Sequence, residues 1–205
     1  MRLDAVTAGW TQGSPVVRQL TVELERPGIT AVTGPNGTGK STLVELVSGY
    51  LRPWEGTVDV GGLPAHAPAA RRHRRVCRTA PALFGLMTVR DHLVLAARSA
   101  GDDIARQLDR AEALGLAPWL DENAGTLSSG TAKKLWYLFC TAGQFDLVVL
   151  DEPFNALDAD AIEHVVDEVG RWGADRCVLV VAHQPPARLR VDRTIDLAPW
   201  AVRGA

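Results

Sequence analysis

The chain has 205 residues, enough for one substantial core and few for two independent domains, which usually take roughly 100 to 200 residues each. Apolar residues make up 46% and charged residues 22%, as in ordinary globular proteins, so the composition excludes a disordered chain. The formal net charge of -2 gives no global reason to expect nucleic acid, whose binding proteins carry a positive excess or a basic face.

No segment has the length of a membrane-spanning helix. The longest uninterrupted apolar runs, Leu135 to Cys140 and Cys177 to Ala182, hold six residues each, whereas a spanning helix needs about 20. The first residues, Met1 to Asp4, lack the charged-then-apolar pattern of a signal peptide. Three scattered cysteines lack the spacing of a metal or redox site. We therefore expect a cytoplasmic protein with reduced thiols.

The first unit along the chain is a strand, a glycine-rich turn and a helix. A partly alternating stretch from Val16 to Leu24 ends at Pro27-Gly28, and Ile29 to Thr33 has the pattern of a buried strand. From Ser41 the apolar residues recur at helical spacing until Gly49.

The later part of the chain contains two kinds of hydrophobic pattern. Helical periodicity covers residues 88–100, 102–114 and 128–142 without intervening strands, which predicts an inserted helical segment. Two continuous apolar runs, 147–150 and 177–181, are typical of central parallel strands buried on both faces. A helix from about Ala159 to Trp172 should separate them.

Residues 34–41 fit the phosphate-binding pattern G-x-x-x-x-G-K-[ST] between the predicted strand and helix. In such a loop the glycines let backbone N–H groups converge on phosphates, Lys40 reaches the β and γ oxygens, and Ser41 offers a ligand to Mg²⁺. A glycine-rich turn capped by Ser41 is the alternative, but the lysine and hydroxyl fall in register. The expected ATP contacts are Gly34, Pro35, Asn36, Gly37, Thr38, Gly39, Lys40, Ser41 and Thr42.

Two carboxylates, Asp151 and Glu152, directly follow the apolar run 147–150. Open α/β sheets carry their ligand sites at the carboxyl ends of strands. Asp151 is therefore expected to hold Mg²⁺, directly or through water, and Glu152 to orient or deprotonate the attacking water. The alternative is an acidic helix start.

Residues 127–131, Leu-Ser-Ser-Gly-Thr, precede a predicted helix and lie upstream of Asp151 and Glu152. In that position they resemble the LSGGQ signature of the ATP-binding-cassette (ABC) ATPases; Ser128 and Gly130 match, whereas Ser129 and Thr131 depart. A hydroxyl, a small residue and a helix N-terminus form a second phosphate-binding surface, which can close over ATP held by another subunit. Ser128 as a simple N-cap is the competing interpretation.

Three more positions fit this family. Asn155 to Asp158 resembles its D-loop, which communicates across a dimer, although Asp158 can also cap the following helix. His183, after the last apolar run, matches the switch histidine that contacts the γ-phosphate. Trp10 stands where the family places an aromatic residue on adenine; a tryptophan packed at the sheet edge is the alternative. The resemblance implies Lys40, Glu152 and His183 as catalytic residues.

One family element is missing. Aligning Leu83-Phe84 with the usual apolar pair of the Q-loop leaves Thr79 where a glutamine is expected. Thr79 can supply a shorter oxygen ligand to the metal, but it cannot span the same distance, so hydrolysis or its coupling to the helical segment should differ. Alternatively, Thr79 is a loop residue before Pro81.

The arginine-rich run Arg71 to Arg75 suggests a nucleic-acid or anionic-lipid site. The negative net charge and the absence of interleaved aromatic residues favour a solvated arginine face before a strand. We therefore expect no nucleic-acid partner.

Taken together, the resemblance implies an α/β P-loop NTPase: an ABC-type ATPase core with a mixed sheet and an inserted α-helical signature subdomain. The whole chain, 1–205, would be one nucleotide-binding domain, with the core at about 1–79 and 145–205 and the helical subdomain at about 80–144. In the family, two such subunits sandwich two ATP molecules head to tail, as a homodimer or a heterodimer. Separate transmembrane permease subunits would complete a transporter, with the ATPase peripheral at the inner face of the cell membrane.

The expected function is ATP hydrolysis that powers transport. Because the chain ends soon after residues 195–197, with no room for the C-terminal regulatory domain of several import ATPases, export is mildly favoured. The alternatives are a soluble non-transport ABC ATPase acting on DNA or ribosomes, which usually carries coiled coils or tandem cassettes, and a regulatory nucleotide binder with weak hydrolysis.

Overall fold

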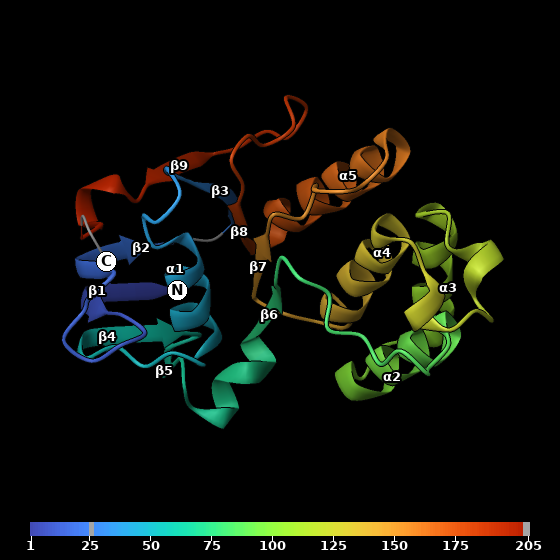
Figure 1. Ribbon diagram of the computed structural model, residues 1–205, viewed down its shortest axis with the longest axis horizontal. Helices are drawn as coiled ribbons and strands as arrows, with labels where there is room; N and C mark the ends of the chain where they lie inside the picture. Colours follow the sequence, from blue (N-terminus) through green and yellow to red (C-terminus); the bar gives the residue numbers. More distant parts are fainter. Residues whose placement is uncertain (25–26, 203–205) are drawn as a thin grey trace.

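The computed structural model describes residues 1–24 and 27–202 and contains two β-sheets (Figure 1). The first sheet is antiparallel, in the order β2-β1-β4-β5. Its strands are β1 (Arg2–Ala8), β2 (Val17–Glu23), β4 (Glu55–Val60) and β5 (Leu63–Pro64). The second sheet is parallel, in the order β6-β7-β8-β3-β9. Its strands are β3 (Gly28–Thr33), β6 (Arg74–Cys77), β7 (Leu147–Asp151), β8 (Cys177–Val181) and β9 (Arg193–Asp196).

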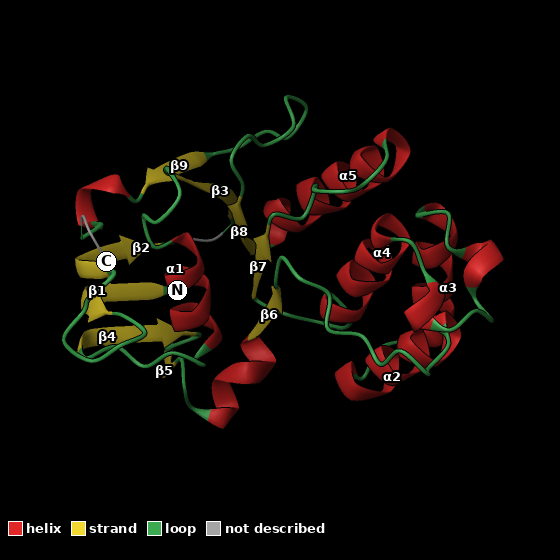
Figure 2. Ribbon diagram, viewed as in Figure 1, coloured by secondary structure: helices red, strands yellow, loops and turns green. Residues whose placement is uncertain are grey.

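The helices fall into three positions (Figure 2). Helix α1 lies between the two sheets, α5 lies along the parallel sheet, and α2, α3 and α4 gather at the far end of the molecule from the antiparallel sheet (Figure 1). The α-helices are α1 (Lys40–Ser48), α2 (Val89–Ala100), α3 (Ile104–Ala113), α4 (Ser129–Cys140) and α5 (Ala159–Asp175). The short 3-10 helices are η1 (Pro68–His73), η2 (Ala117–Trp119), η3 (Ala124–Thr126) and η4 (Ala198–Trp200).

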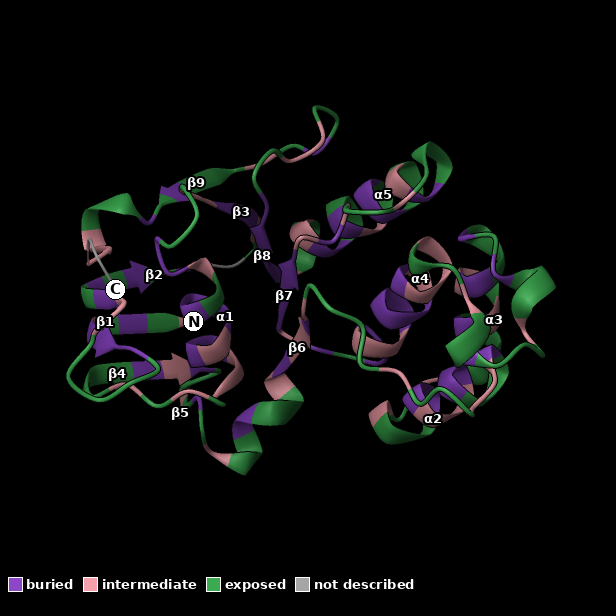
Figure 3. Cartoon of the chain, viewed as in Figure 1, coloured by how far each residue is buried: buried purple, intermediate pink, exposed green. Residues whose placement is uncertain are grey.

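The parallel sheet is covered on both faces, which explains its uninterrupted apolar runs. In β7, Leu147 and Val149 pack into the core shared with α1 and the antiparallel sheet, whereas Val148 and Leu150 pack into the core shared with α4 and α5. Every residue of β7 and β8 is buried (Figure 3). Alternate side chains of a strand point to opposite faces, so a strand between two cores must be apolar throughout.

The elements predicted from periodicity are confirmed. Strand β8 has the predicted bounds, and α5 continues three residues beyond the predicted end at Trp172. Helices α2, α3 and α4 begin after Thr88, Asp103 and Ser128, whose side chains accept hydrogen bonds from first-turn backbone N–H groups. These polar caps satisfy amides that have no acceptor within the helix, which fixes where each helix starts. In the described part of the chain, no helix is both long and apolar enough to span a membrane.

The prediction of a solvated arginine face at 71–75 is wrong for its second half. Arg74 and Arg75 belong to β6, and Arg74 is only 7% exposed. Its guanidinium donates to the Ser48 carbonyl at the end of α1, and Arg75 Nε donates to the Ala142 carbonyl at 2.7 Å. The Ser48 carbonyl is at a helix end, which attracts cations. Both arginines therefore join elements instead of facing solvent. The first two arginines of the run are exposed, as predicted.

A buried ion pair joins three helices. Arg110 of α3 donates from Nε and one terminal nitrogen to Glu168 of α5, at 2.8 and 2.9 Å, and the Tyr137 hydroxyl of α4 donates to the same carboxylate at 2.7 Å. Burial by itself would lower the pKa of Arg110, but the charge and hydrogen bonds of Glu168 outweigh it and raise that pKa. The pair therefore stays charged and fixes α3 and α4 against α5.

Replacing Glu168 tests how much this pair contributes. Glu168→Ala should lower the free energy of unfolding by about 3–5 kcal/mol, because it leaves a buried guanidinium without its counter-ion. The control is Glu163→Ala on the same helix. The Glu163 side chain is 64% exposed and pairs with Arg188, so its loss should cost about 0–1 kcal/mol. Urea denaturation of both variants provides the comparison, and equal losses would contradict the assignment.

Candidate functional site

The glycine-rich segment 34–41 forms the loop between β3 and α1, and its glycines are required by geometry. Gly34, Gly37 and Gly39 have φ of 143°, 81° and 94°, which disfavour residues with a Cβ. A Cβ on Gly39 would also lie 2.5 Å from Val17 Cγ1 of β2. Within the described chain, no side chain caps α1. Its first backbone N–H groups, which lack intrahelical acceptors, are therefore available to an anion.

Lys40 lies over this loop. Its Nζ donates to the Gly34 carbonyl at 2.7 Å and to the Pro35 carbonyl at 3.0 Å. The Ser41 side chain is exposed beside it, whereas Thr42 is 2% exposed and packs beneath the loop. The loop thus brings an ammonium, a hydroxyl and free amides to one surface, and Thr42 can add only its backbone there.

The other motif residues lie at the same edge of the parallel sheet. Strands β6, β7, β8 and β3 are neighbours and run parallel, so their carboxyl ends meet. In that order their carboxyl ends carry Thr79, then Asp151 and Glu152, then His183 and the loop 34–41. Residues far apart in sequence are thereby gathered at the edge where open α/β sheets bind ligands.

Asp151 and Glu152 have distinct surroundings. Asp151 is 9% exposed and accepts a 2.7 Å hydrogen bond from the Thr79 hydroxyl. Glu152 has a φ of 48°, unusual for a residue with a Cβ, and its N–H donates to the Val181 carbonyl at 2.8 Å. Its Oε1 lies 4.0 Å from Nε2 of the exposed His183. The contact of Thr79 with Asp151 disagrees with the alternative that Thr79 is only a loop residue before Pro81.

The segment 127–131 starts helix α4. Ser128 is its N-cap: the hydroxyl accepts from the Thr131 N–H at 3.2 Å and lies 2.8 Å from the Thr131 hydroxyl. Ser129 is exposed at the first helical position. Gly130 is required by packing, because a Cβ there would lie 2.7 Å from the Ala156 carbonyl. The segment thus presents a hydroxyl and a helix N-terminus beside the Asn155–Asp158 turn.

Asp158 caps helix α5, which was one of the two roles expected for it. One carboxylate oxygen accepts from the Ala161 N–H at 2.9 Å, and the other accepts from Lys134 Nζ of α4 at 2.6 Å. The hydrogen bond from Lys134, followed by that from Ala161, holds the pKa of Asp158 below its ordinary value. A turn at the end of β7 is therefore tied to the helix that carries Ser129.

Trp10 lies in the connection between β1 and β2 and is 55% exposed. More than half of the residue is therefore accessible to a partner. Stacking on adenine remains a prediction for this residue.

A set of contacts around Thr79 was missed from the sequence. Lys133 of α4, 4% exposed, donates from Nζ to the Thr79 carbonyl at 2.7 Å, and Trp136 Nε1 donates to the Arg78 carbonyl at 2.9 Å. Arg78 in turn donates two hydrogen bonds to Glu45 of α1, at 2.6 and 2.7 Å. Burial would raise the pKa of Glu45, but the Arg78 and Ser48 hydrogen bonds and the Arg78 charge lower it overall. The sequence signal that could have identified Lys133 is its place on the buried stripe of an apolar helix.

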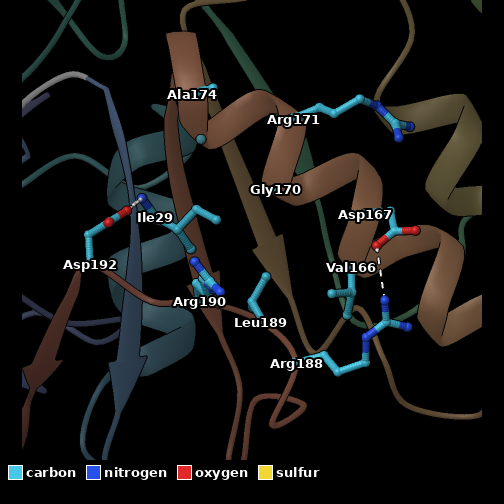
Figure 4. Close-up of a pocket in the computed structure, with 11 residues that line it drawn as sticks. Ile29, Val166, Asp167, Gly170, Arg171, Ala174, Arg188, Leu189, Arg190 and Asp192 are labelled. Atoms are coloured by element: carbon cyan, nitrogen blue, oxygen red, sulfur yellow. Dashed lines mark hydrogen bonds and ion pairs between the residues drawn. The ribbon is translucent and has the colours of Figure 1, made fainter.

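A cavity of about 620 Å³ lies elsewhere, between α5 and the segment before β9 (Figure 4). Three of its charged groups have partners: Arg188 contacts Asp167 at 3.7 Å, and Asp192 accepts from the Ile29 N–H at 2.7 Å. Among the described residues that line it, none belongs to the motifs above. The candidate site is therefore the sheet edge.

Comparison with known proteins identifies this arrangement. A family model described as "ABC transporter" matches residues 17–155, from β2 to the turn after Glu152. The chain belongs to the ABC transporter family. It is an ATP-binding protein with the P-loop ATPase core of that family, as the order of its motifs predicted.

Relatives and solved structures agree with this membership. A taurine import ATP-binding protein from Jannaschia sp. (strain CCS1) is 28% identical over 206 residues, which cover 97% of this chain and 75% of that protein. A retinal-specific phospholipid-transporting ATPase from Bos taurus is 30% identical over 177 residues, covering 83% of this chain and 8% of that protein. A structure of the ATP-binding subunit of an ABC transporter has a TM-score of 0.81 at 25% identity, over 89% of this chain and 78% of that chain. A dimeric bacterial ABC transporter cassette shares the fold, with a TM-score of 0.82 at 17% identity over 96% of this chain and 94% of its own.

Proposed function

We propose that this chain is the ATP-hydrolysing subunit of an ABC transporter and powers transport through separate membrane-spanning subunits. The gathering of the phosphate loop, His183, Asp151, Glu152 and Thr79 along four adjacent strand ends supports this proposal most directly. The chain acts as one nucleotide-binding domain, with a core of residues 1–79 and 145–205 and a helical subdomain of residues 80–144. The permease subunits place it at the inner face of the membrane.

ATP is bound by the loop between β3 and α1. The backbone N–H groups of residues 34–42 surround the phosphates, and Lys40 moves its ammonium from the Gly34 and Pro35 carbonyls to the β and γ oxygens. Trp10 stacks its exposed ring on the adenine.

Oxygen donors suited to Mg²⁺ lie beside this loop, so the residues fit the metal. Ser41 offers an exposed hydroxyl and Asp151 a carboxylate. From the sequence, Thr79 was expected to be a ligand of the metal. Because its hydroxyl donates a hydrogen bond to Asp151, its role in this proposal is to orient that carboxylate. When bound, Mg²⁺ supplies positive charge to the phosphate oxygens.

Glu152 accepts the proton of the attacking water, and His183 holds the γ-phosphate. The 4.0 Å between their side chains allows both to face one reacting group. The hydrogen bond from the Glu152 N–H to Val181 fixes the backbone from which the carboxylate extends. A positioned base of this kind contributes typically about 10²–10⁴-fold to the rate.

A second cassette completes each site. Ser128, Ser129 and Gly130 present a helix N-terminus to the γ-phosphate of ATP held by the partner, and Asp158 faces the dimer interface. The partner is a second copy of this chain or an unlike cassette.

The expected preference for export has no support from the relatives, which include a taurine import ATP-binding protein, and it is not part of this proposal. The relatives and structures named above are transporter components, and none of them favours action on DNA or ribosomes.

Phosphate release from ATP and Mg²⁺ by the purified chain tests the proposal. We expect hydrolysis that Asp151→Asn strongly lowers and that rises when the chain is assembled with its membrane-spanning subunits. A chain that hydrolyses no ATP, or that is stimulated by ribosomes or DNA instead, would contradict the proposal.

A further inference from the structure

Helix α4 contacts the segment after β6 along one continuous face. Lys133, Trp136 and Cys140 follow the i, i+3, i+7 spacing of a single helix face. Their partners are consecutive in the chain: the Thr79 carbonyl, the Arg78 carbonyl and the Cys77 thiol. The spacing shows that residues 77–79 lie along α4 and that three successive residues are held by it.

The same short segment also reaches the other two elements of the nucleotide site. The Arg78 guanidinium holds Glu45 of α1, the helix that begins at the phosphate loop, and the Thr79 hydroxyl holds Asp151 at the end of β7. Thr79 lies two residues beyond the end of β6, where no strand ladder fixes its backbone. Its orientation therefore depends on these side chains.

Lys133 is an unusual residue for this place. Its ammonium is removed from solvent, a costly arrangement for a charge, and within residues 1–24 and 27–202 its hydrogen-bond acceptor is the Thr79 carbonyl. Hydrogen bonds from a charged donor are about twice as strong as neutral ones, and a buried polar group that specifies one geometry is the best-attested use of such groups.

We propose that Lys133 is a positioning residue of the nucleotide site: it fixes the Thr79 backbone so that the Thr79 hydroxyl holds Asp151 in one orientation. Trp136 supports it from the next turn of the helix. Because Ser128 and Ser129 start the same helix, a displacement of α4 also displaces the support of Asp151. This inference rests on the proposed function, in which Asp151 is a metal ligand.

Hydrogen exchange of the nucleotide-free chain tests the clamp itself. In Lys133→Met, which retains the unbranched apolar stem, the peptide that covers residues 78–83 should exchange at least about tenfold faster, since one charge-assisted bond is lost. Lys134→Met is the matched control, because its ammonium bonds Asp158 and not this segment. Unchanged exchange in Lys133→Met, or equal acceleration by both variants, would overturn the inference.

The magnesium dependence tests the positioning role. Lys133→Met should raise the Mg²⁺ concentration at half-maximal hydrolysis about tenfold, with ATP affinity in excess chelator unchanged within about twofold. Thr79→Val should have a similar effect, and adding Lys133→Met to Thr79→Val should add nothing, because the two residues act in series. An additive double variant would show that Lys133 acts independently of Thr79.

Two further variants distinguish a loss of positioning from a loss of the fold. Lys133→Arg retains a charged donor and should resemble the parent, and Trp136→Phe loses one N–H and should shift the magnesium dependence in the same direction by less. If Lys133→Met melts far below the parent, Trp136→Phe becomes the deciding variant. An unchanged magnesium dependence in Trp136→Phe would then overturn the inference. A parent chain without hydrolysis would contradict the proposed function, whereas the exchange experiment would still test the clamp.

Discussion

Lys40→Met should weaken ATP binding by more than about 100-fold. Two charge-assisted hydrogen bonds at about 1.5–3 kcal/mol each are lost when the ammonium is removed, and every 1.4 kcal/mol is about tenfold in affinity. In the nucleotide-free chain this ammonium bonds two carbonyls of its own loop, so it already lies at the proposed phosphate site. Methionine keeps the unbranched apolar stem and removes the terminal ammonium with its charge and donors.

Isothermal titration with ATP in excess chelator measures this effect without contributions from the metal. Arg98→Met, at an exposed position in the last turn of α2, is the control and should bind like the parent. Thermal melting of both variants separates loss of the loop from loss of the fold. Parental affinity in Lys40→Met would show that the phosphates bind elsewhere.

Glu152→Gln should reduce turnover about 10²–10⁴-fold and leave ATP affinity within about threefold. The amide retains the shape of the side chain, and the hydrogen bond that fixes this residue comes from its backbone N–H, so the substitution changes only the proton acceptor.

Single-turnover hydrolysis with excess enzyme measures the chemical step of Glu152→Gln separately from product release. Asp151→Asn is the informative comparison, because its residual hydrolysis should require more magnesium, whereas Glu152→Gln should keep the parental magnesium dependence. Retention of more than about a tenth of the parental rate would assign the base to another residue.

The parts of the fold that the sequence predicted are those whose information is local. Residues 147–150 and 177–181 are apolar because both faces of their strands are covered. Thr88 and Ser128 mark helix starts because their side chains cap the helix within its first turn. The phosphate loop needs glycines at fixed offsets for its backbone angles, and that requirement is visible in the residue types alone.

The antiparallel sheet was predicted only in part, for a physical reason. In β1 the pairing register shifts between Leu3 and Val6 and again between Val6 and Ala8, and Ala5 has a φ of 48°. Such irregularities break the alternation of apolar and polar residues on which strand prediction depends. Strand β4 also contains Gly56 with a φ of 78°, where a Cβ would meet β1 backbone atoms.

The candidate site was predicted as a set of positions but not as a set of contacts. Alignment placed Thr79 at the site, but its bond to Asp151 spans 72 residues and its bond from Lys133 spans 54. Neither separation leaves a periodic signal. Arg74 and Lys133 were missed for the same reason: a charged residue is expected at the surface, and only the folded chain shows the carbonyl that makes its burial tolerable.

In the proposed dimer, two cassettes enclose ATP between the phosphate loop of one and Ser128–Gly130 of the other. The mass of Glu152→Gln in solution tests this arrangement most directly. Sedimentation velocity with ATP and Mg²⁺ should give twice the mass of one chain, and with ADP a single chain. Adding Ser129→Asp should abolish the dimer, because it places a negative charge against the partner's γ-phosphate at a helix start that tolerates acidic residues. A single chain under both nucleotides at high protein concentration, or a dimer unaffected by Ser129→Asp, would contradict the claim.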